Sequence, residues 1–206
     1  MKKYVVIFGM VALPFYGQAY DGTIAQSGLC GQTEADCSYT LYDDGHLEIT
    51  GTGRMNDYVC CGAGAAPWPK KISQVSISGI TYIGVSAFHD SELTEVTIPA
   101  SVEELGDAAF QRAQLESVNF TENSSLKIIG DGVFNGIPSL QTLDIPSGVS
   151  AIGENAFNKS GIDNITLPDA VFSIDNIVDE IRAPYFHGLN LRALSDVANV
   201  YCSDAV

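Results

Sequence analysis

The residues best suited to catalysis or metal binding in this 206-residue chain are its three histidines and five cysteines. His46, His89 and His187 lie far apart in sequence, and none belongs to an HExxH or similar metal-binding motif. A histidine beside Cys60 or Cys61 would in principle create a thiolate nucleophile, but no residue pattern here orients such a base. A disulfide or an idle surface thiol is the better interpretation. We therefore predict no enzyme activity, no catalytic residues, no cofactor and no metal site.

The cysteines also bear on the compartment and the oligomeric state. Cys30 and Cys37 enclose a short polar loop and are the preferred disulfide pair. Cys60 and Cys61 are adjacent, and neighbouring cysteines seldom bond to each other because the resulting ring is strained. One of them would reach Cys202 only if the chain ends meet. Because the number of cysteines is odd, at least one thiol stays free or bonds to another molecule, and an unpaired cysteine offers a route to an oligomer.

The first nineteen residues have the three-part layout of a secretory signal peptide. Two lysines follow the initiator methionine, residues 5–15 form an apolar run, and Gly17-Gln18-Ala19 places small residues where signal peptidase recognises them. We therefore expect a signal peptide over residues 1–19 and a protein that is secreted, displayed on the cell surface or periplasmic.

The composition excludes several classes of protein. Hydrophobic residues make up 46% of the chain and charged residues only 17%, which predicts a folded domain with a real core. Acidic residues outnumber basic ones by 25 to 10, and a net charge of -15 repels the phosphate backbone of nucleic acids. No apolar run reaches the roughly 20 residues that a membrane-spanning helix needs. We expect neither a nucleic-acid partner nor a membrane span.

The middle of the chain repeats one pattern four times. Each copy has a glycine with a phenylalanine four residues later, and these pairs are Gly84/Phe88, Gly106/Phe110, Gly130/Phe134 and Gly153/Phe157. The four glycines lie 22, 24 and 23 residues apart, and a fifth copy begins at Ile162 and then decays. Self-similarity with a period of roughly 20 to 50 residues is typical of a solenoid.

Each copy opens with the alternation of a half-buried strand. In the second copy, Leu93, Val96 and Ile98 are expected to face the core, whereas Glu95 and Thr97 face outward. Proline then ends the strand in three of the copies. After the glycine, Ala-Phe is predicted to begin a short helical or irregular stretch on the opposite side. Because one such unit cannot bury its own apolar face, the units must stack, with parallel strands on one side and the phenylalanines inside.

The unit Leu-x-x-Val-x-Ile-Pro-x-x-Val-x-x-Ile-Gly-x-x-Ala-Phe resembles the BspA-type leucine-rich repeat of bacterial and some protist surface proteins. The resemblance covers residues 72–175, in repeats of about 22 to 25 residues. The third copy departs from it, since Phe120-Thr121 replaces Ile-Pro, and Asp175 occupies the glycine position of the fifth. The resemblance implies an α/β-type repeat solenoid: a short leucine-rich repeat stack with a parallel strand face and an irregular or short-helical convex side. It also implies an adhesin-like role, because members of the family often bind host matrix proteins.

A repeat stack needs caps that cover its apolar ends. We predict a β-rich N-terminal cap over residues 20–71, which includes Cys30 and Cys37. Within it, the turn Asp43-Asp44-Gly45 is expected to join two strands as a hairpin. Trp68 is expected to pack against the first repeat rather than to form a ligand platform. Residues 176–206 are predicted to form a degenerate last repeat and a C-terminal cap.

The outward strand positions are the candidate ligand-binding residues. In the stack they align as two ladders across the repeats, and they offer amide, hydroxyl and carboxylate groups that suit a protein or glycan on another cell or matrix. The first ladder contains Gln74, Glu95, Ser117, Thr142 and Asn164, and the second contains Ser76, Thr97, Asn119, Asp144 and Thr166. Two alternatives stay open. These polar side chains would also simply keep an exposed sheet soluble, and the protein would then have a structural or assembly role without a dedicated ligand.

Overall fold

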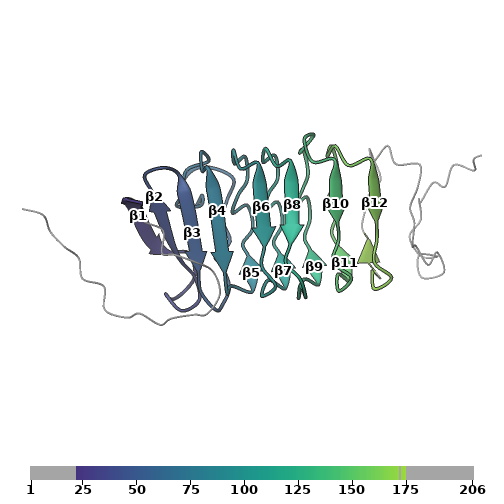
Figure 1. Ribbon diagram of the computed structural model, residues 1–206, viewed down its shortest axis with the longest axis horizontal. Helices are drawn as coiled ribbons and strands as arrows, with labels where there is room; N and C mark the ends of the chain where they lie inside the picture. The colour runs from purple at the N-terminus through teal and green to yellow at the C-terminus, as the bar shows by residue number, and fades with distance from the viewer. Residues whose placement is uncertain (1–21, 172, 175–206) are drawn as a thin grey trace, which may run out of the picture.

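The computed structural model describes residues 22–171 and 173–174. The predicted signal peptide and the predicted C-terminal cap at 176–206 lie outside these residues. Within the described part, the chain forms an elongated solenoid in which the strands run across the long axis (Figure 1). A row of longer strands forms one side and a row of two-residue strands forms another, so the backbone winds once around a central core in each repeat.

The strands fall into three groups. The N-terminal group is β1 (Ile24–Leu29), β2 (Ser38–Tyr42) and β3 (His46–Thr50). The row of longer strands is β4 (Gln74–Ser78), β6 (Glu95–Ile98), β8 (Ser117–Phe120), β10 (Thr142–Asp144) and β12 (Asn164–Thr166). The row of short strands is β5 (Tyr82–Ile83), β7 (Glu104–Leu105), β9 (Ile128–Ile129), β11 (Ala151–Ile152) and β13 (Ser173–Ile174).

Both rows are parallel and advance by one repeat at each step. The short strands form one sheet in the order β13-β11-β9-β7-β5. Among the longer strands, β6 pairs with β8 and β10 pairs with β12, and Val96 lies opposite Val118. The predicted parallel strand face is therefore confirmed.

The N-terminal hairpin joins the stack directly. β2 and β3 are antiparallel on either side of the Asp43-Asp44-Gly45 turn, as the sequence predicts, and β1 pairs antiparallel with β2. β3, however, pairs parallel with β4, and Arg54 pairs parallel with Tyr82 in the short row. The coil that begins at β3 thus behaves as one more repeat upstream of residue 72.

An aromatic column runs through the core. Phe88, Phe110, Phe134 and Phe157 are at most 1% exposed, and successive rings are nearly parallel, with centroids 5.1, 5.9 and 6.0 Å apart. Trp68 continues the column, because its ring stacks on Phe88 at 5.7 Å and it is 6% exposed. Trp68 therefore occupies the phenylalanine place of the coil that begins at β3, in agreement with its predicted packing role.

The convex side carries turns, and the short-helical form of the prediction is wrong for the described residues. Two residues per repeat, four positions apart, adopt a left-handed backbone; in the second repeat they are Ala108 and Arg112, with φ of 54° and 58°. Every second amide of this segment donates its hydrogen bond to the next coil rather than to its own. The amide of Phe110, for example, donates to the carbonyl of Val133 at 3.1 Å. In an α-helix each of these amides would donate to the carbonyl four residues earlier, so no α-helix can form here.

Successive coils approach each other closely at the repeated glycines. A Cβ on Gly130 would lie 2.5 Å from Oδ1 of Asp107 and 2.9 Å from the Asp107 amide nitrogen. The same Asp107 carboxylate accepts the Asp131 amide at 2.8 Å, and the Asp131 carboxylate accepts the Glu154 amide at 2.8 Å. The glycine is required because any side chain would push the neighbouring coil away and break this contact.

A disulfide closes the N-terminal region. It joins Cys30 to Cys37, the pair that the sequence favours, and both are fully buried. The backbone on either side is tied by a hydrogen bond from the amide of Cys30 to the carbonyl of Cys37 at 2.9 Å. The described residues contain no helix long and apolar enough to cross a membrane.

Replacement of Gly130 by alanine tests the close approach of the coils. We expect Gly130→Ala to lower the free energy of unfolding by about 2 to 3 kcal/mol, because the added methyl group has backbone on the neighbouring coil in its way. The matched control is Gly148→Ala, in which the atom nearest to the added methyl group would be the Leu126 carbonyl oxygen at 3.3 Å. We expect the loss of stability in this control to be well below that of Gly130→Ala. Equal losses in chemical denaturation would contradict the role assigned to Gly130.

Candidate functional site

The strand face exposes one side chain in two, as the sequence predicts. In β6, Glu95 and Thr97 are exposed, whereas Val96 and Ile98 are at most 2% exposed and belong to the core. The same alternation holds for β4 and β10. The polar residues of this face are therefore directed away from the core and available for contact.

The two predicted ladders are in register where the strands are paired. Glu95 lies opposite Ser117, and Thr97 lies opposite Asn119. The ladders are also linked to each other, because Nδ2 of Asn119 donates a hydrogen bond to Oε1 of Glu95 at 2.9 Å. This bond orients both side chains and leaves the second carboxylate oxygen of Glu95 as an acceptor.

The C-terminal part of the face follows the same register. Thr142 pairs with Asn164, and Asp144 pairs with Thr166. Asp144 is exposed and borders a shallow hollow of about 640 Å³, whose other lining residues are Ile145, Ser147, Pro168, Asp169 and Ala170. A protruding group of a partner would find room beside this carboxylate.

The face extends into the N-terminal hairpin, which the sequence did not reveal. Glu48 lies opposite Ser76, and Thr50 lies opposite Ser78. Oε2 of Glu48 accepts a hydrogen bond from the hydroxyl of Tyr42 at 3.2 Å, and burial together with the Glu48 charge raises the pKa of Tyr42. The sequence does indicate a strand at His46–Thr50, because polar and apolar residues alternate there as they do in β4. Nothing in the sequence, however, shows that β3 runs parallel to β4.

The charges on this face have one sign. Its carboxylates are Glu48, Glu95 and Asp144. None of the strands β3, β4, β6, β8, β10 and β12 contains a lysine or arginine, so basic residues of the described part lie elsewhere. The face is therefore acidic and lined by amides and hydroxyls.

Two of the three histidines have side chains with little exposed surface. His46 is 9% exposed, and the side chain of His89 is 7% exposed. His187 lies outside the described residues. The described part of the chain contains no group of three or more His, Cys, Asp or Glu residues that could hold a metal ion.

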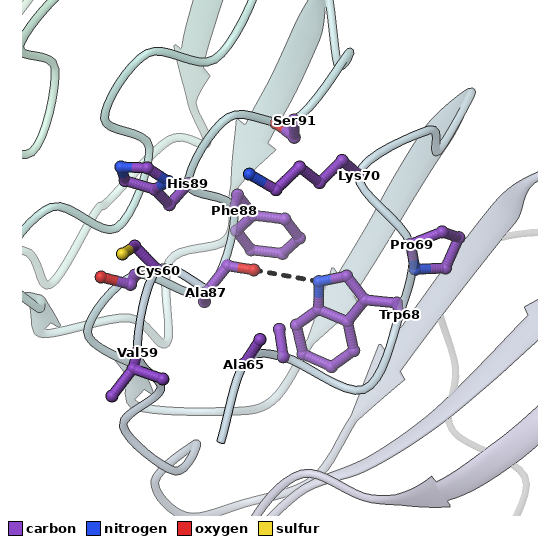
Figure 2. A pocket seen from close by; sticks show the side chains of 12 residues that line it. Val59, Cys60, Ala65, Trp68, Pro69, Lys70, Ala87, Phe88, His89 and Ser91 are labelled. Atoms are coloured by element: carbon purple, nitrogen blue, oxygen red, sulfur yellow. Dashed lines mark hydrogen bonds between the residues drawn. The ribbon is translucent and has the colours of Figure 1, made fainter. Parts of the chain in front are cut away.

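A small pocket lies on the convex side next to Trp68 (Figure 2). It measures about 40 Å³, and the indole nitrogen of Trp68 donates to the carbonyl of Ala87 at 3.0 Å along its wall. Cys60, His89 and Ser91 also line it, and the Ser91 hydroxyl is buried without a hydrogen bond in the described structure. Organic ligands usually occupy several hundred Å³, so this volume suits a few water molecules.

An ion-pair cluster adjoins this pocket, because Lys70 and His89 belong to both. Asp90 lies 2.6 Å from Nζ of Lys70, 2.8 Å from Nε of Arg112 and 3.2 Å from Nδ1 of His89. Burial alone would raise the pKa of Asp90, but the hydrogen bond from Lys70 and the charges of His89, Lys70 and Arg112 outweigh it and lower the pKa. The cluster joins three coils.

Cys60 and Cys61 are both exposed, and their sulfur atoms are 3.4 Å apart. The contact with Cys60 raises the pKa of the Cys61 thiol. The structure thus brings Cys60 and His89 to the same pocket but pairs each of them with another group, the Cys61 thiol and the Asp90 carboxylate respectively.

Parallel strands, one close-packed glycine per coil and an internal phenylalanine column define a leucine-rich repeat solenoid. The chain belongs to the family described as the BspA type leucine rich repeat region, whose model matches residues 68–179 in six copies. The match begins at Trp68, the first ring of the aromatic column.

One solved structure agrees with this assignment. A leucine-rich repeat protein from Eubacterium ventriosum is 33% identical with a TM-score of 0.65, and the alignment covers 76% of this chain and 41% of that one. A Treponema pallidum leucine rich repeat protein is 21% identical, with a TM-score of 0.48 and coverage of 68% and 62%. The chain thus spans about two fifths of the Eubacterium protein. None of the curated proteins matches this chain at a significant level.

The Asp90 cluster predicts a specific dependence of stability on pH. The pKa of Asp90 is lower in the folded state than its ordinary value of 3.8, so the ionised carboxylate stabilises the fold at pH values above 3.8. This stabilisation is lost as the pH falls through the pKa of Asp90 in the folded state. We expect Asp90→Asn to be less stable than the native chain at pH 7, by at most about 1 kcal/mol because the pairs are largely exposed. The difference should be smaller at about pH 2, because more of the Asp90 carboxylate is then protonated.

The measurement is chemical denaturation of both proteins at the two pH values. Asp163→Asn is the control, since Asp163 is exposed and its carboxylate takes part in none of the ion pairs of the described residues. A native chain and an Asp90→Asn variant of equal stability at pH 7 would contradict the prediction.

Proposed function

We propose that this protein is an exported, non-catalytic recognition module that binds a protein or glycan of another cell or matrix through its strand face. Membership of the BspA-type family supports this, because the resemblance noted above associates such repeats with bacterial surface proteins. The signal-peptide pattern over residues 1–19 supports export. Repeat solenoids commonly bind through such extended surfaces.

One observation carries the proposal: a face of outward polar side chains that runs from β3 to β10. Parallel backbone pairing holds these residues in register within the pairs β3–β4, β6–β8 and β10–β12, so a partner would meet an ordered array. The Asn119–Glu95 hydrogen bond orders two of these side chains before any partner arrives. Preordered groups lose less conformational entropy on binding, which favours affinity.

The charge of the face favours a partner with basic groups. Glu48, Glu95 and Asp144 project from it, and no lysine or arginine lies in its strands. Its outward positions in β4, β6, β8 and β10 also lack aromatic rings. Hydrogen bonds and complementary charge, rather than ring stacking, would therefore supply specificity. Among protein and glycan ligands, we favour a protein surface rich in lysine and arginine.

A binding screen with matched variants tests this proposal. The purified chain is applied to an array of matrix proteins and glycans, and each saturable ligand is measured again with the double variant Glu95→Lys/Asp144→Lys. We expect affinity to fall by about tenfold or more, because both changes place positive charge where the partner carries positive charge. The control is Glu103→Lys/Glu154→Lys, which changes net charge equally at exposed positions off the strand face. If a ligand binds the double variant and the control with equal affinity, or binds the control more weakly, the strand face is not its binding site.

The edge strand β1 favours a second candidate, a structural or assembly role. Within the described residues, β1 pairs only with β2, and it exposes Ile24 by 54% and Leu29 by 48%. An exposed apolar edge strand can add a strand from another chain.

The assembly candidate predicts a molecular mass that rises with concentration in light scattering. We expect Ile24→Lys to prevent this rise, since a lysine on an edge strand opposes pairing between edges. Ile128→Lys is the control, because Ile128 is also exposed, by 42%, but lies in β9 of the short row. The mass of one chain at every concentration would dismiss assembly through β1.

A further inference from the structure

The loop that carries Cys60 and Cys61 is an insertion in the coil that begins at β3. Because Arg54 pairs with Tyr82, Met55 corresponds to Ile83, and the stacked rings make Trp68 correspond to Phe88. Five positions separate Ile83 from Phe88, whereas thirteen separate Met55 from Trp68. The coil therefore contains eight additional residues that the repeat itself does not need.

The insertion is anchored at its base, and its tip at residues 60–64 is exposed. The amide of Tyr58 donates to the carbonyl of Val85 at 2.9 Å, and the amide of Val59 donates to the carbonyl of Gly64 at 3.0 Å. Between these anchors, Gly62 has a left-handed backbone, and a Cβ on it would contact nothing within 4 Å. The tip can therefore adjust its backbone without disturbing the core.

The two thiols at this tip are adjacent in space as well as in sequence. Their sulfur atoms lie 3.4 Å apart, both residues are exposed, and Cys60 also lines the pocket next to Trp68. The pair is thus within a small adjustment of bonding distance and open to an external disulfide.

We propose that Cys60 and Cys61 form a reversible disulfide with each other, so that the inserted loop is a thiol–disulfide exchange site. This differs from the sequence-based expectation that adjacent cysteines leave one another unpaired. The expectation considered ring strain alone, whereas the structure adds sulfur atoms already in contact and a glycine-rich loop that can absorb the strain.

The chemistry requires an oxidant, which we take to be a small-molecule or protein disulfide. The thiolate of one cysteine attacks the oxidant, forms a mixed disulfide and releases one thiol. The second cysteine then attacks its neighbour's sulfur and releases the second thiol. Overall, two cysteine thiols are oxidised, one disulfide is reduced to two thiols, and the two protons are transferred to the leaving thiolates.

The same geometry makes the bond reversible. Adjacent Cα atoms are separated by about 3.8 Å, whereas disulfides usually join Cα atoms roughly 4.4 to 6.8 Å apart. A strained disulfide is reduced more easily than an unstrained one. We therefore expect the Cys60–Cys61 bond to open at reductant concentrations that leave the buried Cys30–Cys37 bond intact.

Peptide mapping tests the bond directly. The purified chain is equilibrated with oxidised and reduced glutathione, alkylated and digested with trypsin. Cleavage after Arg54 and Lys70 gives one peptide, residues 55–70, with both thiols and no other cysteine. We expect this peptide to be unalkylated and lighter than its dithiol form by two hydrogen atoms in the oxidising buffer, and doubly alkylated after mild reduction.

Several results would overturn the proposal. They are a 55–70 peptide that stays doubly alkylated in buffers where Cys30–Cys37 is closed, a stable glutathione adduct, or a disulfide to Cys202 or to a second chain. Because the test uses glutathione alone, it stands apart from the strand-face proposal.

Fluorescence gives an independent readout on intact protein. Trp68 is the only tryptophan of the chain and lines the same pocket as Cys60. We expect its emission to change with the glutathione ratio at the same midpoint as the peptide mass. Cys60→Ser/Cys61→Ser, two exposed substitutions, should show no change over that range, and an equal change in this variant would contradict the proposal.

Discussion

The close approach of successive coils is the constraint on which the rest of this structure depends. Successive coils form backbone hydrogen bonds along the short-strand row and at the turns, and also along the row of longer strands where β3 pairs with β4, β6 with β8 and β10 with β12. This explains why glycine lies where the coils touch and why an aspartate carboxylate accepts the next coil's amide. It also explains the stacked flat rings of the coils from Trp68 to Phe157. The ring centroids are 5.1 to 6.0 Å apart, so neighbouring phenylalanine rings pack against each other through the core. The strand face inherits its regular spacing from the same requirement.

The parts of the fold that follow from this constraint were predictable from sequence. The glycine and phenylalanine spacing identified the repeat, and the alternation in Leu93–Ile98 identified which side chains face outward. The convex side was harder, because Ala-Phe favours a helix locally. What prevents a helix is the donation of alternate amides to another coil and the left-handed backbone at residues such as Ala108, which are tertiary effects. For the same reason His89 proved buried: its surroundings come from neighbouring coils rather than from its own segment.

The N-terminal region shows how a repeat can be recognised only after folding. The coil from β3 to Trp68 lacks the Ala-Phe motif and carries an eight-residue insertion, so its sequence does not align with the others. Its structure nevertheless supplies a parallel strand, a short-row bridge and an aromatic ring to the stack. Glu48 consequently joins the strand face, and the inserted loop places two thiols beside the first repeat. Both candidate sites, the face and the dithiol, therefore depend on this atypical coil.

The direction of the hydrogen bonds between coils also has a mechanical meaning. These bonds lie along the solenoid axis, since the strands run across it (Figure 1). A pulling force along that axis would load the bonds of one interface at a time, so the coils would part in sequence, as a zipper opens, rather than yield together in shear. A partner bound across several strands would bridge these interfaces and share the load. Tension on an attached protein of this kind would thus be resisted best where its ligand spans the greatest number of coils.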